Sequence, residues 1–111
     1  MAIFYVVDSL DDVTITVNTY SNTSTFFQAG KASSNTQRSA ARFIGINIPQ
    51  GSTILTAYLE LVCSFAKSGT DVLTNLALEN VDDATRIVDQ ADFDARVLTD
   101  PVPWDNIAGW D

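Results

Sequence analysis

The clearest pattern along this chain is an alternation of apolar and polar residues with a period of two, which is typical of β-strands that bury one face. Residues 13–18 alternate strictly between apolar, β-branched side chains and Thr or Asn. Residues 55–65 and 72–79 show the same alternation. We predict a strand in each stretch. In the longest strand, residues 55–65, the side chains expected to line the core are Leu55, Ala57, Leu59, Leu61, Cys63 and Phe65.

Weaker patterns predict three further strands. Residues 1–7 are mostly apolar, residues 26–30 begin with two phenylalanines, and residues 38–48 place isoleucine at every second position near their end. The composition of residues 30–37 predicts a loop. Gly45 indicates a bulge or a close neighbour within its strand, because glycine weakens a regular strand.

Proline, glycine and aspartate mark the connections between these strands. Pro49 cannot donate to a sheet ladder and ends a strand, while Gly51 can supply the positive φ of a type II turn. Asp89 is a candidate N-cap for a short helix over residues 91–96. Residues 101–104 are predicted to be extended, because each proline restricts the residue before it.

Many short strands, frequent turn signals and the lack of a sustained helical pattern indicate an all-β protein. The architecture expected from such a pattern is an antiparallel β-sandwich or barrel. A chain of 111 residues is long enough for one domain with one core. We therefore predict a single β-sandwich domain over residues 1–111.

Charge and composition narrow the list of partners and activities. The net charge is −8 and the pI is near 4.1, so nucleic acid and acidic membranes would repel the chain and neither is expected as a partner. Histidine is absent, which removes the commonest general base and metal ligand, and we expect no enzyme. Cys63 is the one cysteine and is expected to be a small buried hydrophobe. The N-terminus does not resemble a signal peptide, so synthesis in a cytoplasm is expected.

A segment in the middle of the chain resembles a known family. Arg42 and Phe43, followed by the sequence INIPQGSTILTAYLEL, are similar to a segment of the galactose-binding-like, carbohydrate-binding-module-like β-jelly-roll domains. In that family the turn joins two neighbouring strands, and the positions matched by Ala57 and Leu59 pack under the partner sheet. Residues 77–110 resemble the next section, where an acidic, Ala-rich loop leads to an extended segment that carries tryptophan.

The resemblance implies an antiparallel jelly roll and a limited set of roles. Such domains occur in bacterial surface proteins, in polysaccharide-degrading enzymes and in bacteriophage tail or capsid-decorating proteins. Family members usually continue for several strands after the tryptophan segment, whereas this chain stops. We therefore expect that missing C-terminal strands or another chain completes the sandwich, because an unfinished sheet invites strand pairing in trans.

Acidic side chains offer two kinds of chemistry. Three pairs could mimic the carboxylates of a glycosidase, although such aspartates are more often solvated in turns: Asp11 with Asp12, Asp82 with Asp83, and Asp92 with Asp94. The better functional hypothesis is a structural Ca²⁺, because calcium prefers oxygen ligands on loops. The predicted ligands are Asp89, Asp92 and Asp94, and the alternative is a polar loop with a helix cap.

Aromatic side chains suggest a binding surface. Tyr58, Trp104 and Trp110 could stack on sugar rings, and the alternative for all of them is packing in a core or an interface. Trp110, Phe4 and Tyr5 are predicted to reach another subunit, since interface cores are enriched in aromatic residues.

These patterns favour a non-catalytic structural or assembly module. The expected role is a bacteriophage virion protein, assembled in the host cytoplasm as a capsid-decorating, tail or fibre subunit. The expected partners are further copies of the chain or other virion proteins. The alternative is a carbohydrate-binding module of a surface or polysaccharide-degrading protein, which would be extracellular and would bind a glycan.

Overall fold

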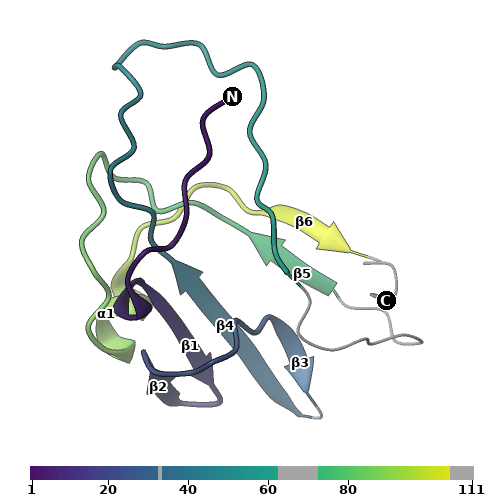
Figure 1. The fold of residues 1–111 in the computed structure, drawn as a ribbon. Coiled ribbons are helices and arrows are strands. Elements are labelled where there is room, and N and C mark those ends of the chain that lie inside the picture. The colour runs from purple at the N-terminus through teal and green to yellow at the C-terminus, as the bar shows by residue number, and fades with distance from the viewer. Residues whose placement is uncertain (33, 63–72, 106–111) are drawn as a thin grey trace.

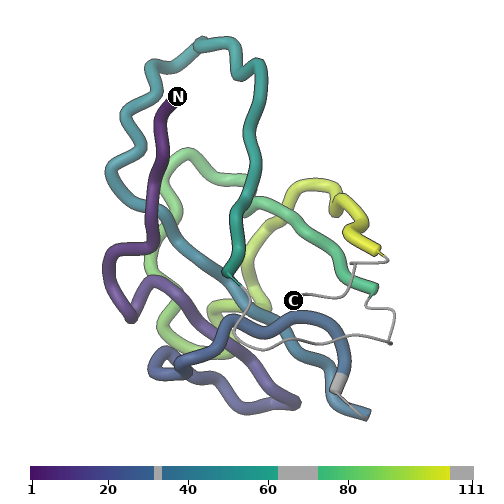
Figure 2. Tube along the Cα trace, turned by 45° about the vertical axis from the view of Figure 1, so that its right-hand side comes forward, coloured from purple at the N-terminus to yellow at the C-terminus, as the bar shows by residue number. Residues whose placement is uncertain are grey.

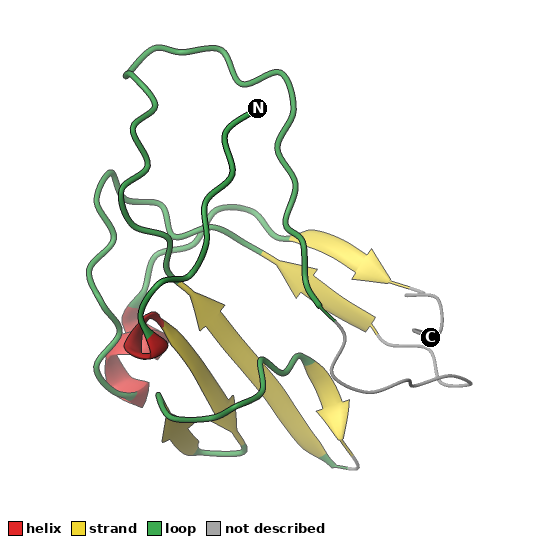
Figure 3. Ribbon diagram, viewed as in Figure 1, coloured by secondary structure: helices red, strands yellow, loops and turns green. Residues whose placement is uncertain are grey.

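The computed structural model describes residues 1–32, 34–62 and 73–105 and is mostly strand and extended loop (Figure 1). The elements follow in this order: η1 (Ser9–Asp11), β1 (Asp12–Thr16), β2 (Thr19–Ser21), β3 (Gly30–Ala32), β4 (Asn35–Ala41), β5 (Leu73–Leu76), α1 (Gln90–Ala95) and β6 (Val102–Asp105). Two antiparallel sheets, one short α-helix and one turn of 3-10 helix therefore make up the regular structure of the described residues, which is consistent with the predicted all-β class (Figure 3).

The larger sheet has the strand order β2-β1-β4-β3 and holds the core. The strand predicted for residues 13–18 is confirmed as β1, which pairs with β2 on one side and β4 on the other. Val13 and Ile15 are buried on one face of β1, as the alternation predicts. Thr14, on the other face, is buried too. Its polar hydroxyl is satisfied there, since it donates to the carbonyl of Phe26 at 2.9 Å and lies 3.0 Å from the Ser39 hydroxyl.

The smaller sheet pairs β5 with β6 in an antiparallel register that sets Thr74 opposite Trp104. The extended segment predicted at residues 101–104 is thus a strand. The pairing continues irregularly beyond β5, since Thr99 N–H donates to Leu78 O at 2.9 Å and Asn80 N–H donates to Val97 O at 2.8 Å.

Several predicted strand boundaries are wrong. Residues 1–7 and 26–29 form no strand, and the loop predicted at residues 30–37 contains β3 and the start of β4. The strand predicted for residues 38–48 is displaced toward the N-terminus and ends at Ala41. Period-two alternation marks residues able to form a strand, but a strand also needs a partner for its backbone groups.

The long strand predicted at residues 55–65 is also absent from the part that the structure describes, residues 55–62. Leu55, expected in the core, is 91% exposed, and Leu59 is 45% exposed. Without a neighbouring strand, residues 55–60 are exposed on both sides of the alternation, and Leu61 is half-buried. Cys63 and Phe65 lie outside the described residues.

The local turn and cap predictions fare better. Ser52 N–H donates to Pro49 O at 3.1 Å and Gly51 has a φ of 83°, as a type II turn requires. Asp89 is the N-cap of α1, where its carboxylate accepts from Asp92 N–H at 2.8 Å. The close neighbour predicted at Gly45 is wrong, because a Cβ there would meet nothing within 4 Å; its φ of 71° is what favours glycine.

Over the ranges that the structure describes, no helix is long and apolar enough to cross a membrane.

Candidate functional site

The most unusual feature of the molecule is a long apolar excursion, residues 43–62, which we call the arm. It leaves the end of β4, turns back at Pro49–Ser52 and returns beside the N-terminal segment, residues 1–7 (Figures 1 and 2). Most large apolar side chains of both segments are exposed: Ile3, Tyr5, Val7, Ile44, Ile46, Ile48, Ile54, Leu55, Tyr58, Leu59 and Val62. A folded monomer seldom presents so many contiguous apolar side chains to water.

The arm lies apart from both sheets over much of its length and has few internal bonds. Within residues 1–7 and 43–62, the one backbone hydrogen bond between described residues is the turn bond from Ser52 to Pro49. The side chain of Tyr58 reaches the N-terminal segment, where its hydroxyl lies 3.2 Å from the sulfur of Met1. The extended backbone of the arm therefore keeps N–H and C=O groups that another strand could pair with.

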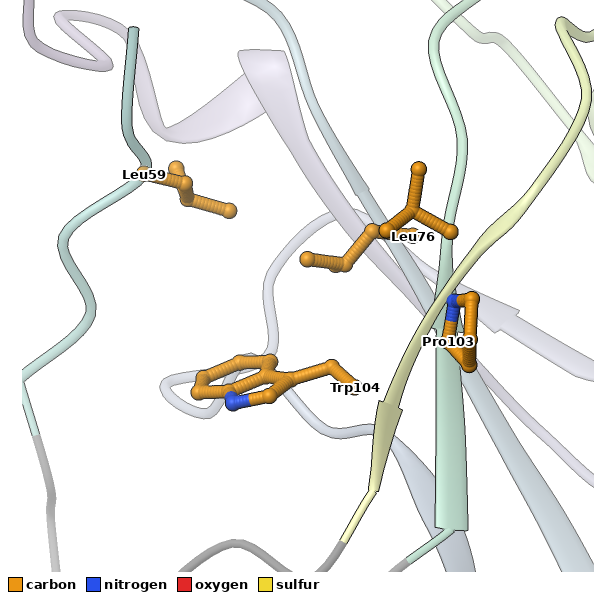
Figure 4. Close-up of a pocket in the computed structure, with 5 residues that line it drawn as sticks. Leu59, Leu76, Pro103 and Trp104 are labelled. Carbon is orange, nitrogen blue, oxygen red and sulfur yellow. The ribbon is translucent and has the colours of Figure 1, made fainter.

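The base of the arm faces the smaller sheet across an apolar cavity of about 240 Å³ (Figure 4). Leu59 enters it from the arm and Trp104 from β6, and the other lining residues are Leu76, Val102 and Pro103. Figure 4 shows the Leu59 and Trp104 side chains on opposite sides of the cavity. This arrangement would accept an apolar side chain.

A second candidate site is a charged cluster at the start of β1. The side chain of Asp11 is fully buried, and its Oδ1 accepts from Arg86 Nε at 3.0 Å and from Arg42 Nη1 at 3.1 Å. Arg86 also pairs with Asp8 at 2.8 Å. The hydrogen bond from Arg86 lowers the pKa of Asp11, with help from Arg42 and against the effect of burial. Among described residues, Oδ2 of Asp11 is buried without a hydrogen-bond partner.

This cluster fixes the loop that contains Arg86. The carbonyls of four consecutive residues, 84–87, accept hydrogen bonds from side chains elsewhere in the chain. Arg42 binds the first at 2.7 Å, Arg96 binds the next two, and the Tyr20 hydroxyl binds the last at 2.8 Å. Burial raises the pKa of Tyr20, so this hydroxyl keeps its proton and remains a donor. Three side chains thus hold an irregular segment that has no ladder of its own.

Arg96 joins α1 to the same loop. Its guanidinium pairs with Glu79 at 3.0 Å and with Asp92 at 2.7 Å, and only 11% of its side chain is exposed. The hydrogen bond from Arg96 lowers the pKa of Asp92, and a backbone bond from Val88 adds to the effect. The pKa of Arg96 is raised in turn, chiefly by its hydrogen bond to Asp92, so Arg96 and Asp92 form a stable ion pair.

The predicted calcium ligands have other partners in the structure. Asp89 caps α1, Asp92 binds Arg96, and Asp94 pairs with Arg38 at 2.6 Å. In the described ranges no group of three or more His, Cys, Asp or Glu side chains is placed to hold a metal ion. The calcium site remains a prediction, and the arrangement seen here is that of a capped helix with ion pairs.

The predicted aromatic residues are separated. Tyr58 is 67% exposed on the arm, while Trp104 is half-buried and faces Leu59 across the cavity. In the N-terminal segment Tyr5 is 70% exposed and Phe4 is half-buried. Trp110 lies outside the described residues. The interface role of Phe4, Tyr5 and Trp110 stays a prediction.

Sequence reasoning missed the two arginines of the charged cluster, Arg42 and Arg86, and Arg96 beside it. The chain has only 6 Lys and Arg residues against 14 Asp and Glu, and Arg42, Arg86 and Arg96 all bind acids. Where acidic residues outnumber basic ones, each arginine is expected to form an ion pair with one of them. The excess of acidic residues was therefore the sequence feature that could have indicated these pairs.

Comparison with models of protein families, with curated proteins and with solved structures gave no match to this chain.

Proposed function

We propose that this chain is a non-catalytic structural module that works in an assembly, as a bacteriophage virion component of the capsid-decorating, tail or fibre type. The observation that carries the proposal is the arm, a long apolar segment with Glu60 as its single charged residue, which lies apart from both sheets over much of its length (Figure 1). Apolar surfaces of this size mark sites of protein association.

The total surface supports association. The chain exposes 8829 Å², whereas a folded monomer of its 12.1 kDa mass exposes about 6,000 Å². The radius of gyration, 14.9 Å, exceeds the roughly 13 Å of a compact domain of this length. The excess is about 2,800 Å² per chain, or about 5,600 Å² for two chains, and obligate interfaces bury about 2,000–5,000 Å² over both partners.

A jelly-roll sandwich completed in the assembly accounts for the two small sheets. The proposal assigns the arm and the N-terminal segment to strands that form when a partner supplies the missing ladder. Residues 54–62 keep the alternation that a sandwich strand needs, and the turn at Pro49–Ser52 reverses the chain just before them.

The charged cluster supports a structural role over a catalytic one. Asp11 and Asp92 belong to the acid pairs that resemble a glycosidase site, and arginine lowers the pKa of both. A general acid needs the opposite, a pKa raised toward the working pH. Their hydrogen bonds instead join distant parts of the chain.

The carbohydrate-binding alternative has weaker support. The cavity beside Trp104 is lined by Leu59, Leu76, Val102 and Pro103, whose side chains offer no hydrogen bond to a sugar hydroxyl. Sugar sites combine an aromatic platform with polar groups that fix orientation.

Sedimentation velocity of the purified chain over a range of concentrations tests the assembly role. We expect oligomers at micromolar concentration, and a monomer throughout would contradict the proposal. Immunogold labelling of phage particles with antibodies against the chain tests the virion role, and a glycan array tests the alternative. Labelled particles with an empty array support the first function, whereas unlabelled particles with specific glycan binding support the second.

A further inference from the structure

We propose that residues 54–62 of the arm pair antiparallel with the same residues of a second copy across a two-fold axis, with Tyr58 opposite Tyr58. This inference rests on the proposed assembly function and names its contact. The observation behind it is an extended, alternating segment that has no strand partner within the described residues.

Charge favours a second copy as the occupant. Two chains of net charge −8 repel one another over most of their surfaces. Residues 43–62 contain Glu60 as their single Asp, Glu, Lys or Arg, and residues 1–7 contain none. Like chains can therefore approach along the arm without bringing many like charges together.

The exposed apolar surface also favours a second copy as the partner. The arm and the N-terminal segment include many of the most exposed large side chains, among them Leu55 at 91% and Val62 at 90%. Over the whole chain, and not on the arm alone, the surface exceeds that of a compact monomer by about 2,800 Å², and obligate homodimer interfaces bury about 2,000–5,000 Å² over both subunits. A contact that is the same on both subunits is the commonest form of homo-oligomer interface.

The sequence of the segment is compatible with the register centred on Tyr58. Antiparallel pairing about Tyr58 sets Leu55 opposite Leu61 and Ala57 opposite Leu59, so one face of the new ladder is wholly apolar. The other face sets Glu60 opposite Thr56. Pairing centred on Glu60 would place two carboxylates face to face, which is destabilising.

The register can be tested with opposite charges at the two-fold axis. Tyr58→Glu and Tyr58→Lys each place like charges opposite one another, and we expect each to raise the dimer dissociation constant more than about tenfold. An equimolar mixture pairs Glu with Lys and should restore the dimer. Sedimentation velocity and native mass spectrometry, which separates the heterodimer by mass, measure both effects. The matched control is Val88→Glu, at an apolar side chain that is 67% exposed outside the arm, and it should leave the dimer intact.

Each outcome decides between pairing and its alternatives. Dimers unaffected by either charge would overturn this contact while leaving the assembly function standing. Two dissociated variants that fail to restore a dimer on mixing would overturn the Tyr58 register. A wild-type chain that is monomeric at every concentration, with residues 54–62 protected from amide hydrogen exchange, would place the partner strand within one chain and overturn both proposals.

Discussion

Arg86 donates a hydrogen bond of 3.0 Å to Asp11 across 75 residues of sequence, and the Asp11 side chain that accepts it is fully buried. This bond ties the start of β1 to the irregular loop before α1. Because Arg42 binds the same carboxylate oxygen, one buried acid anchors two separate parts of the chain.

Asp11→Asn removes the charge from the centre of the cluster but keeps a side chain of nearly the same shape. Hydrogen bonds to charged groups stabilise folded proteins more than neutral ones, so we expect the free energy of unfolding to fall by about 1–2 kcal/mol at neutral pH. Urea unfolding measures the change. Asp12→Asn is the matched control, because none of the ion pairs among described residues involves Asp12. An equal loss in both variants would contradict the special role of Asp11.

Acid should weaken the fold through the same carboxylates. The pKa values of Asp8, Asp11 and Asp92 are all lowered from 3.8 by hydrogen bonds to the ionised form. Their contribution is therefore fully present above the unfolded pKa and is lost as the pH falls through the folded values. We expect urea midpoints to hold steady down to about pH 5 and to drop below about pH 4. In Asp11→Asn the drop should be shallower, and a parallel curve would count against the cluster.

The sequence predicted local features of this fold better than its long-range ones. The β1 alternation, the turn at Gly51 and the cap at Asp89 each depend on neighbours within a few residues, and all three are confirmed. The strands predicted over residues 38–48 and 55–65 required neighbouring strands to pair with, and the alternation within one segment does not show whether such a neighbour exists. Backbone pairing is a property of two segments, so alternation in one segment cannot establish it.

The charged cluster was hidden for a similar reason. Arg86 and Asp11 look like ordinary surface residues in sequence, since no local pattern links positions so far apart. The aspartates of residues 89–94 were visible as a group, but the structure directs them to Arg96, to Arg38 and to the helix cap. Acid clustering alone did not reveal these partners.

Two arginines beside α1 should differ sharply in their effect on stability. Arg96 is nearly buried and binds Glu79, Asp92 and two backbone carbonyls, so Arg96→Ala should lower the free energy of unfolding by about 2–3 kcal/mol. Arg38 pairs with Asp94 at 38% exposure and lies 5.1 Å from the centre of the Phe93 ring. Exposed pairs contribute less, and Arg38→Ala should cost below about 1 kcal/mol.

Thermal and urea unfolding of both arginine variants checks this contrast. Helix content measured by circular dichroism should fall in Arg96→Ala, because the loop and α1 lose their common anchor. Similar stabilities for Arg96→Ala and Arg38→Ala would show that the guanidinium of Arg96 does not hold the loop.

The turn between β1 and β2 contains a residue that is poorly suited to it. Thr16 pairs with Thr19, so Val17 and Asn18 form a two-residue loop, and Val17 has a φ of 62°. Left-handed backbone costs an L-residue about 1–2 kcal/mol, and a β-branched side chain fits it badly. Glycine removes this strain at an entropic cost of about 0.5–1 kcal/mol, so Val17→Gly should stabilise the protein by about 0.5–1 kcal/mol.

Asn18→Gly is the control for this turn, because Asn18 has no positive φ to relieve. It carries the entropic cost of glycine without the gain and should be neutral or slightly destabilising. Thermal unfolding of the two variants measures the difference directly. Since Val17 is 49% exposed, its replacement by glycine loses little packing. A lower melting temperature for Val17→Gly than for Asn18→Gly would mean that the valine side chain stabilises the hairpin by more than the backbone strain costs.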